Sequence, residues 1–197
     1  MATLLLAFAT LGTAWSAYQT REWTGEQSQG YSRATKNRIA VNRVSAVANR
    51  QVQIDVATFV QWVDARERGN TKLADFYRQR FRDEFEPAFA AWLATNPLTN
   101  PSAPETPFAM PQYRLAANAE AERLEAAAGV DSNSAKDANE RANAYMLAVV
   151  LFASALFFAG LSTKLESPGS RKAVLALGCL LFVGTFVYLA TLPIRLA

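Results

Sequence analysis

The stretch AYMLAVVLFASALFFAGLST, residues 144–163, decides the fold class of this 197-residue chain. None of its 20 side chains is charged, and about 20 apolar residues in a helix cross the ~30 Å hydrocarbon core of a bilayer. A second uncharged stretch, AVLALGCLLFVGTFVYLATL, occupies residues 173–192. We predict that both cross a membrane as helices, because a chain this small has too little other mass to bury them. A buried hairpin in a soluble protein is the alternative interpretation.

The N-terminal stretch ATLLLAFATLGTAWSAY is also uncharged, and its 17 residues are the short end of a spanning helix. A secretory signal peptide is the alternative, with an apolar run at residues 4–11 and Ala14 as a cleavage point. No Lys or Arg precedes that run, which favours an uncleaved anchor at residues 1–18. Trp15, Tyr18 and Trp23 then form an aromatic belt at the outer membrane interface.

The connector between the second and third spans, residues 164–172, reads KLESPGSRK and carries three positive charges against one negative. An excess of Lys and Arg in a short loop indicates the cytoplasmic side of the membrane. We therefore expect a cytoplasmic N-terminus, an external domain at 19–143 and an external tail at 193–197.

The external domain holds 16 of the 20 Lys and Arg residues and 16 of the 17 Asp and Glu residues. We predict that it is a helical hairpin, since no proline occurs between Tyr18 and Pro87. The first helix has an apolar face formed by Val41, Val44, Ala48, Val52, Val56, Phe59 and Val63, spaced three or four residues apart. It is expected to end at Gly69-Asn70. The chain returns through residues 114–143, with a predicted break at 129–134 where Asp131 or Ser132 caps the final helix.

A second helix of the hairpin is predicted to open with Thr71 as its N-cap. It carries aromatic side chains mostly at every fourth position, namely Tyr77, Phe81, Phe85, Phe89 and Trp92. Pro87 either kinks this helix or restarts it. We interpret the aromatic residues as a core face packed on the first helix, and an exposed docking face for a partner protein as the alternative.

Residues 96–113 hold five prolines and no glycine, which predicts an extended, polyproline-like connector. Phe108, Met110 and Tyr113 are the apolar side chains with which such a strap would bind a neighbouring surface. A disordered tip of the hairpin is the alternative.

Charge supports antiparallel pairing of the two long arms of the domain, because residues 19–54 are net positive and 105–140 net negative. This pairing brings three basic residues level with three acidic ones, namely Lys36, Arg38 and Arg43 with Glu125, Glu122 and Glu120. Exposed ion pairs contribute only about 0–1 kcal/mol each, so these charges set register more than stability.

Small residues form faces on two of the spans that allow close helix packing in a membrane. They are Ala9, Gly12, Thr13 and Ser16 in the first span, and Ala155, Ala159 and Gly160 in the second. We expect the chain's own three spans to pack there, with assembly into a homo-oligomer as the alternative.

No catalytic pattern is found in the sequence. It has no histidine and one cysteine, Cys179, and it lacks both a glycine-rich phosphate loop and a G-x-S-x-G motif. Carboxylates at Asp83, Glu84 and Glu86 could bind a hard cation, but a solvated helix face looks the same. We expect no enzymatic activity, no cofactor, no metal site and, on an external face, no nucleic acid partner.

The segment AWSAYQTREWTGEQ at residues 14–27, with Tyr31, Arg38-Ile39-Ala40 and Asp55…Phe59…Trp62, resembles a bacterial membrane-protein family of unknown function. In that family a first span continues into a helix with the motif W-S-x-Y-Q-x-x-x-W-x-G-E-Q, and two spans close the chain. The resemblance covers the whole length in layout and implies a multi-pass protein of the bacterial inner membrane with a periplasmic main domain. It implies no activity.

These features together predict an all-α integral membrane protein with three spans and a long extracytoplasmic helical hairpin. The expected function is that of a structural or accessory subunit that stabilises a larger membrane complex, for example a respiratory or photosynthetic one. Its partners would be other membrane subunits and lipid. A homo-oligomeric channel or membrane scaffold, and more weakly a periplasmic sensor, are the alternatives.

Overall fold

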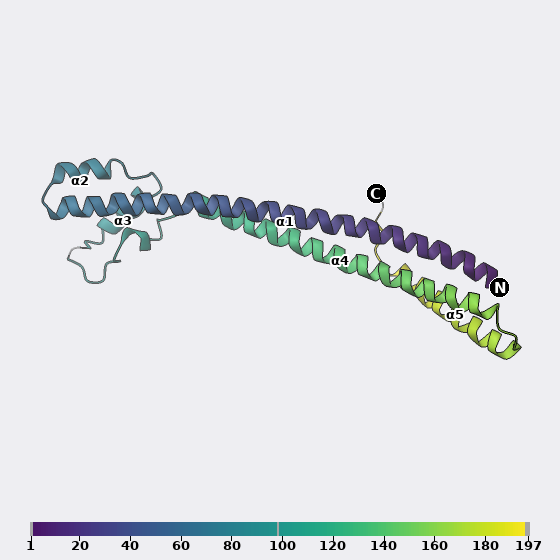
Figure 1. Ribbon diagram of the computed structural model, residues 1–197. Helices are drawn as coiled ribbons and strands as arrows, with labels where there is room; N and C mark the ends of the chain where they lie inside the picture. The colour runs from purple at the N-terminus through teal and green to yellow at the C-terminus, as the bar shows by residue number, and fades with distance from the viewer. Residues whose placement is uncertain (1, 98, 196–197) are drawn as a thin grey trace. The chain divides into compact units, whose positions relative to one another are not determined.

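The computed structural model describes residues 2–97 and 99–195, and their regular structure is entirely helical (Figure 1). The elements are α1 (Ala2–Glu67), α2 (Thr71–Arg78), α3 (Glu86–Leu93), the 3-10 helix η1 (Pro107–Ala109), α4 (Ala116–Ser162) and α5 (Pro168–Ala190). The predicted all-α fold class is thereby confirmed. The chain divides into unit 1, Met1–Ala34 with Gly129–Ala197, and unit 2, Thr35–Ala128.

Helix α1 contains no proline and ends at Glu67, two residues before the predicted Gly69-Asn70 signal. Gly69 adopts a left-handed backbone with φ of +71°, the conformation that glycine tolerates best at a helix C-terminus. Asn70 donates its N–H to the carbonyl of Ala65 at 2.9 Å. Its side chain then accepts a hydrogen bond from the Leu73 N–H at 3.1 Å. Asn70, and not Thr71 as predicted, is therefore the N-cap of α2.

The structure has two short helices where the sequence predicted the single second helix of the hairpin. Helix α2 stops at Arg78, and α3 begins at Glu86 with Pro87 in its first turn. Proline is favoured in that position because the first turn of a helix leaves its N–H groups without partners. Of the two predicted outcomes at Pro87, the restart is the one observed.

Helix α4 passes through residues 129–134 without the predicted break. Asp131 and Ser132 are therefore interior helix residues and cap nothing. The helix faces α1 here: a Cβ added to Gly30 would lie 2.9 Å from the Ala135 Cβ. Tertiary packing of the buried Ala128, Ala135 and Ala138 thus offsets the helix-breaking preference of Gly129.

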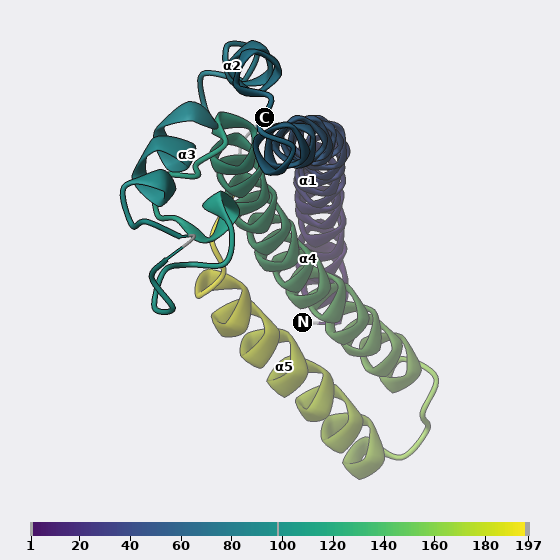
Figure 2. The ribbon, with the colours of Figure 1, turned by 90° about the vertical axis from the view of Figure 1, so that its left-hand side faces the viewer.

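In unit 1 the connection between α4 and α5 is short, and α5 returns antiparallel beside α4 (Figure 2). The helices approach closely at Gly178, whose added Cβ would lie 3.4 Å from the Ala155 carbonyl oxygen. Helix α5 begins at Pro168, earlier than the predicted 173, and ends at Ala190. Pro168 therefore lies in the first turn of a helix, within the stretch 164–172 that was predicted to be the connector.

Two helices of the described chain, α4 and α5, are long and apolar enough to cross a membrane by length and composition. The N-terminal part of α1 is not among them, so the first span stays a prediction. Many large apolar side chains of unit 1 are exposed, including Leu4, Phe8, Leu11, Met146, Leu147, Val150, Phe157, Leu180, Val183, Phe186 and Val187.

Candidate functional site

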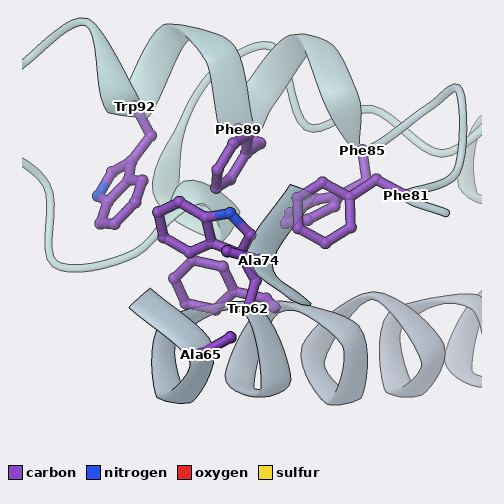
Figure 3. Close-up of a cluster of buried hydrophobic side chains, with 8 residues drawn as sticks. Trp62, Ala65, Ala74, Phe81, Phe85, Phe89 and Trp92 are labelled. Atoms are coloured by element: carbon purple, nitrogen blue, oxygen red, sulfur yellow. The ribbon is translucent and has the colours of Figure 1, made fainter. Parts of the chain in front are cut away.

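The core of unit 2 is a cluster of aromatic rings contributed by α1, α3 and the segment before α3 (Figure 3). Its buried members are Phe59, Trp62, Ala65, Ala74, Phe81, Phe85, Phe89 and Trp92. Edge-to-face contacts dominate: the rings of Trp62 and Phe89 lie 4.7 Å apart at 81°. Such pairs contribute about 0.5–1.5 kcal/mol each beyond their buried area. The aromatic residues of the second predicted helix therefore pack as a core against α1. Phe81, Phe85, Phe89 and Trp92 are buried by the chain itself.

The proline-rich connector packs against this aromatic cluster. The Trp92 indole Nε1–H donates to the Pro104 carbonyl at 2.8 Å, and the Phe108 ring stacks on Phe85 at 5.1 Å. Tyr77, Met110 and Tyr113 are partly buried against the same cluster. The predicted strap is therefore ordered where the structure describes it, and it lies on its own chain; residue 98 lies outside the described residues.

An open pocket of about 500 Å³ lies at the edge of the aromatic cluster. Trp62, Trp92 and Leu93 line it from the helices, and Pro101 and Pro104 line it from the connector. Arg66, Glu67 and Glu105 add charges to the lining. Its composition suits an apolar side chain or a small apolar ligand.

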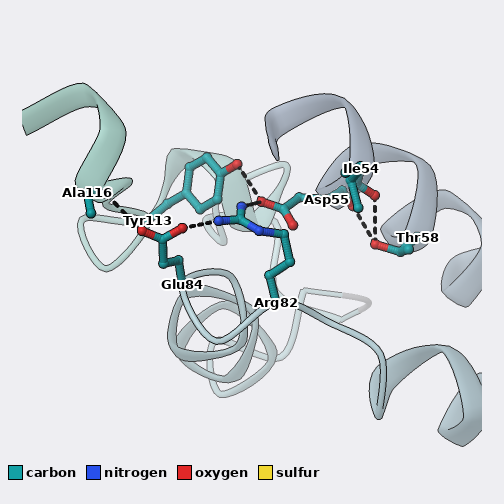
Figure 4. A network of polar contacts seen from close by, with 7 residues as sticks. All are labelled: Ile54, Asp55, Thr58, Arg82, Glu84, Tyr113 and Ala116. Carbon is teal, nitrogen blue, oxygen red and sulfur yellow. Dashed lines mark hydrogen bonds and ion pairs between the residues drawn. The ribbon is translucent and has the colours of Figure 1, made fainter. Parts of the chain in front are cut away.

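A buried carboxylate, Asp55, was not predicted from the sequence and organises the polar side of unit 2. Its side chain is fully buried, and its Oδ2 accepts hydrogen bonds from Arg82 Nη1 and from the Tyr113 hydroxyl, both at 2.9 Å. Arg82 also pairs with Glu84, whose Oε1 accepts the N–H of Ala116 at 2.9 Å (Figure 4). The network therefore joins α1, the turn before α3, the connector and the start of α4.

Burial and hydrogen bonding act in opposite directions on Asp55. Burial raises the pKa of the Asp55 carboxyl, and the hydrogen bond from Tyr113 and the charge of Arg82 lower it, with burial the larger effect. The pKa of Tyr113 is raised by burial and by its bond to Asp55. Asp55 Oδ1 has no partner among the described residues. The periodic sequence pattern predicted Val56 on the buried face of α1. In the structure the neighbouring Asp55 is buried at 0% exposure, whereas Val56 is 39% exposed.

The motif at residues 14–27 meets the C-terminal tail in unit 1. The buried Gln19 side chain donates to the Arg195 carbonyl at 2.8 Å and accepts the Arg195 N–H at 3.0 Å. The Tyr145 hydroxyl donates to the Pro193 carbonyl at 3.2 Å. Gln19 therefore fixes the backbone of the C-terminal tail at Arg195. This contact could not be predicted from the sequence of the motif or of the tail alone.

Glu26 is the acidic centre of this motif. It pairs with Arg195 at 2.6 Å and with Arg33 at 3.2 Å. The hydrogen bond from Arg33 is the main cause that lowers the pKa of Glu26, and Arg195 adds to it against burial. The charged form of Glu26 is thus favoured by two arginines.

The three aromatic residues predicted to form a belt at the membrane interface differ in their exposure. Trp15 and Tyr18 are 37% and 39% exposed, with ring centroids 5.8 Å apart. Trp23 is only 7% exposed. The guanidinium carbons of Arg141 and Arg195 lie 4.6 and 5.7 Å from its ring centroid. Arginines distant in sequence therefore cover Trp23, and the membrane-interface belt stays a prediction.

The small residues predicted to pack in the membrane are largely buried within unit 1. Ala9, Ser16, Ala155 and Ala159 are all 0% exposed. A Cβ on Gly12 would lie 2.8 Å from the Phe152 ring. Thr13 is bonded to its own helix at the Ala9 carbonyl, and the position of a Cβ on Gly160 has no neighbour within 4 Å. Most of this small-residue set therefore serves packing among the chain's own helices.

Among the described residues, the predicted partners Lys36, Arg38 and Arg43 form no ion pair with Glu125, Glu122 and Glu120, although α1 and α4 contact each other close to the predicted antiparallel register. In the part of the chain that is described, Glu120 pairs with Arg123 of its own helix, while the pair that joins α1 to α4 is Arg33 with Asp131 at 3.2 Å. Glu84 and Glu86 are engaged by arginines. Among the described residues no group of three or more His, Cys, Asp or Glu side chains is placed to hold a metal ion.

The chain matches no protein-family model, no curated protein and no solved structure. The family resemblance drawn from the motif at residues 14–27 therefore stays a prediction.

Proposed function

We propose that this chain is a structural or accessory subunit of a larger membrane complex, anchored by three spans with residues 19–143 outside a bacterial inner membrane. The spans would be residues 1–18 and the apolar parts of α4 and α5. The exposed apolar side chains of unit 1 support this placement, since soluble proteins rarely expose large contiguous apolar patches. The charge of the 164–172 connector supports a cytoplasmic turn.

The observation that carries the subunit role is an uncovered face of α1 in unit 2. Ile39, Val47, Ile54 and Val60 are 48%, 39%, 51% and 53% exposed. Their spacing of six to eight residues puts them within an arc of about 140° of the helix circumference. Arg43 and Arg50 are exposed on the same face. An apolar face with interspersed arginines suits an apolar partner helix with acidic flanks.

The test is gentle extraction of the full chain from native membranes, followed by size analysis and mass spectrometry of the proteins that migrate with it. We expect a defined set of other subunits. Val47→Glu should release them, because it places a charge in the proposed interface. Thr71→Glu adds the same charge at an exposed position at the start of α2, outside this face, and should leave the complex intact.

Purification of the chain alone as a monodisperse species would contradict the subunit role. A ring of identical chains would favour the scaffold or channel alternative instead. Co-migration unaffected by Val47→Glu would mean that the α1 face is not the interface.

A further inference from the structure

A groove of about 520 Å³ lies in unit 1 between α1, α4 and the C-terminal tail. Trp23, Arg141, Asp137 and Arg195 are among its lining residues. A second hollow of about 350 Å³ is lined by Asp137, Glu140, Arg141, Ala144 and Leu192. The two adjoin, because they share Asp137 and Arg141.

Both arginines of the groove stand at the ends of apolar segments. Arg141 is the last charged residue before the uncharged run 142–163, and Arg195 is the first charged residue after Lys172. The bond from Tyr145 to the Pro193 carbonyl shows that these two ends lie at the same level. In a bilayer this is the level of the phospholipid headgroups, where arginine and tryptophan are favoured.

Two hydrogen-bond donors of the groove, the Arg141 guanidinium and the Trp23 indole N–H, are available to a ligand. Arg195 is neutralised by Glu26, but Arg141 makes no ion pair with any described residue and instead stacks on the Trp23 ring at 4.6 Å. The Trp23 indole Nε1–H is buried without an acceptor in the described part of the chain. A guanidinium and an indole N–H side by side suit the oxygens of a phosphate group.

The adjoining hollow is more acidic than the groove, because Asp137 and Glu140 line it with Arg141 as the cation. Asp137 and Glu140 are exposed carboxylates, and neither forms an ion pair within the described residues. They would repel a purely anionic headgroup and attract an ammonium group that can donate hydrogen bonds. Ala144 and Leu192 supply apolar surface on the membrane side of the same hollow.

We propose that this groove binds a zwitterionic phospholipid of the phosphatidylethanolamine type, with its phosphate at Arg141 and Trp23 and its ammonium at Asp137 and Glu140. The proposal rests on the membrane placement argued above but needs no partner subunit. A bound lipid would satisfy the indole N–H and neutralise three charges that the chain leaves unpaired.

The test is native mass spectrometry of the purified full chain in detergent with equimolar phosphatidylethanolamine and phosphatidylglycerol. We expect preferential retention of one phosphatidylethanolamine. Arg141→Gln should lower that retention by about tenfold or more, the effect of losing a charge-assisted hydrogen bond. Arg171→Gln, an exposed arginine in the first turn of α5, is the matched control and should change nothing.

A second variant keeps the test independent of folding. Asp137→Asn with Glu140→Gln should switch the preference towards phosphatidylglycerol, a gain that a misfolded chain would not show. Equal retention of the two lipids by the natural chain, or full retention by Arg141→Gln, would overturn the proposal. Displacement of the lipid by soluble phosphoethanolamine at equal concentration would show that the site recognises a free phosphate ester and not a lipid.

Alkaline carbonate extraction separates this proposal from the proposed function. A chain released by carbonate would overturn the membrane placement and the lipid site together. An inserted chain that retains no phosphatidylethanolamine would overturn the lipid site alone, and co-purifying subunits would still support the subunit role.

Discussion

At the scale of single residues, two acidic side chains bring together residues that are distant in the sequence. Asp55 in unit 2 gathers Arg82 and Tyr113 from positions 27 and 58 residues away. Glu26 in unit 1 gathers Arg33 and Arg195. Hydrogen bonds to a carboxylate offset the cost of removing it from water, so each of these donors should matter to stability.

Tyr113→Phe tests the Asp55 network. The variant keeps the ring that packs on Phe85 but removes a donor to Asp55, which should raise the pKa of Asp55 further. We expect a loss of about 1–3 kcal/mol in the free energy of unfolding, as for a hydrogen bond to a charged group. Denaturant unfolding of the full chain, followed by tryptophan fluorescence, measures it. Tyr31→Phe removes an exposed hydroxyl and should cost nothing; equal losses would contradict a special role for Tyr113.

Acid should weaken the ion pair that Arg195 of the C-terminal tail forms with Glu26. The pKa of Glu26 is lowered from its ordinary value of 4.5, so folding favours its charged form. The resulting stabilisation is present above pH 4.5 and is lost as the pH falls through the lower, folded-state pKa. The NMR signal of the Arg195 amide should follow this titration. Glu26→Gln should abolish the transition, and its persistence in that variant would assign it to another group.

At the scale of elements, helix packing in unit 1 depends on where the glycines face. Gly30 meets α4 closely, and the atoms within 3.2 Å of an added Cβ include the Ala135 Cα and the Asp131 carbonyl oxygen. Gly129 has no neighbour within 4 Å of that position. Gly30 therefore allows close packing of two helices, whereas Gly129 does not. The helix propensity of glycine alone does not distinguish the two positions.

Gly30→Ala should destabilise unit 1, because the added methyl contacts backbone that can move only if the helices separate. Overpacking of this kind costs about 1–3 kcal/mol. Gly129→Ala should be neutral or should stabilise the chain by up to about 1 kcal/mol through higher helix propensity. Thermal unfolding of both variants in the same detergent, followed by circular dichroism, compares them. Similar melting temperatures would show that α1 and α4 do not pack closely at Gly30.

Gly12→Ala offers a second comparison in the same unit. Its Cβ would lie 2.8 Å from the Phe152 ring, and the loss should be restored in large part by Phe152→Leu, which makes room for the methyl. Gly184→Ala has no neighbour within 4 Å and is the control. The same thermal unfolding assay applies; failure of the second substitution to restore stability would argue against direct contact between these positions.

At the scale of the whole molecule, the proposed topology can be tested by cysteine accessibility. Cys179 is the natural cysteine, so Cys179→Ser provides a background without thiols. We expect Ser102→Cys, in the connector, to react with a membrane-impermeant maleimide in intact cells. Ser170→Cys, in the first turn of α5 on the proposed cytoplasmic side, should react only after the cells are opened. Labelling of both positions in intact cells would contradict the three-span topology.

Much of the fold follows from the sequence, because helices and spans depend on local properties. Uncharged runs at 144–163 and 173–192 predicted the two helices able to cross a membrane. The Gly69-Asn70 pair predicted the end of α1, and periodic aromatic residues predicted the core of unit 2. Among the errors, the N-cap of α2 is Asn70 instead of Thr71, because the choice between the two depends on side-chain geometry. The break predicted at residues 129–134 does not occur, because packing on α1 outweighs the local helix propensity.

The sites depended on the tertiary structure. Gln19 and Arg195 are 176 positions apart, and no periodicity links them; the same holds for Trp23 and Arg141. The sequence by itself determined an all-α chain with apolar helices of membrane-spanning length, since hydrophobic length and helical period are local quantities. Only the tertiary structure decided that Asp55 is buried, that Trp23 is covered and that the tail is clamped, because these depend on which distant side chains supply hydrogen bonds and charge.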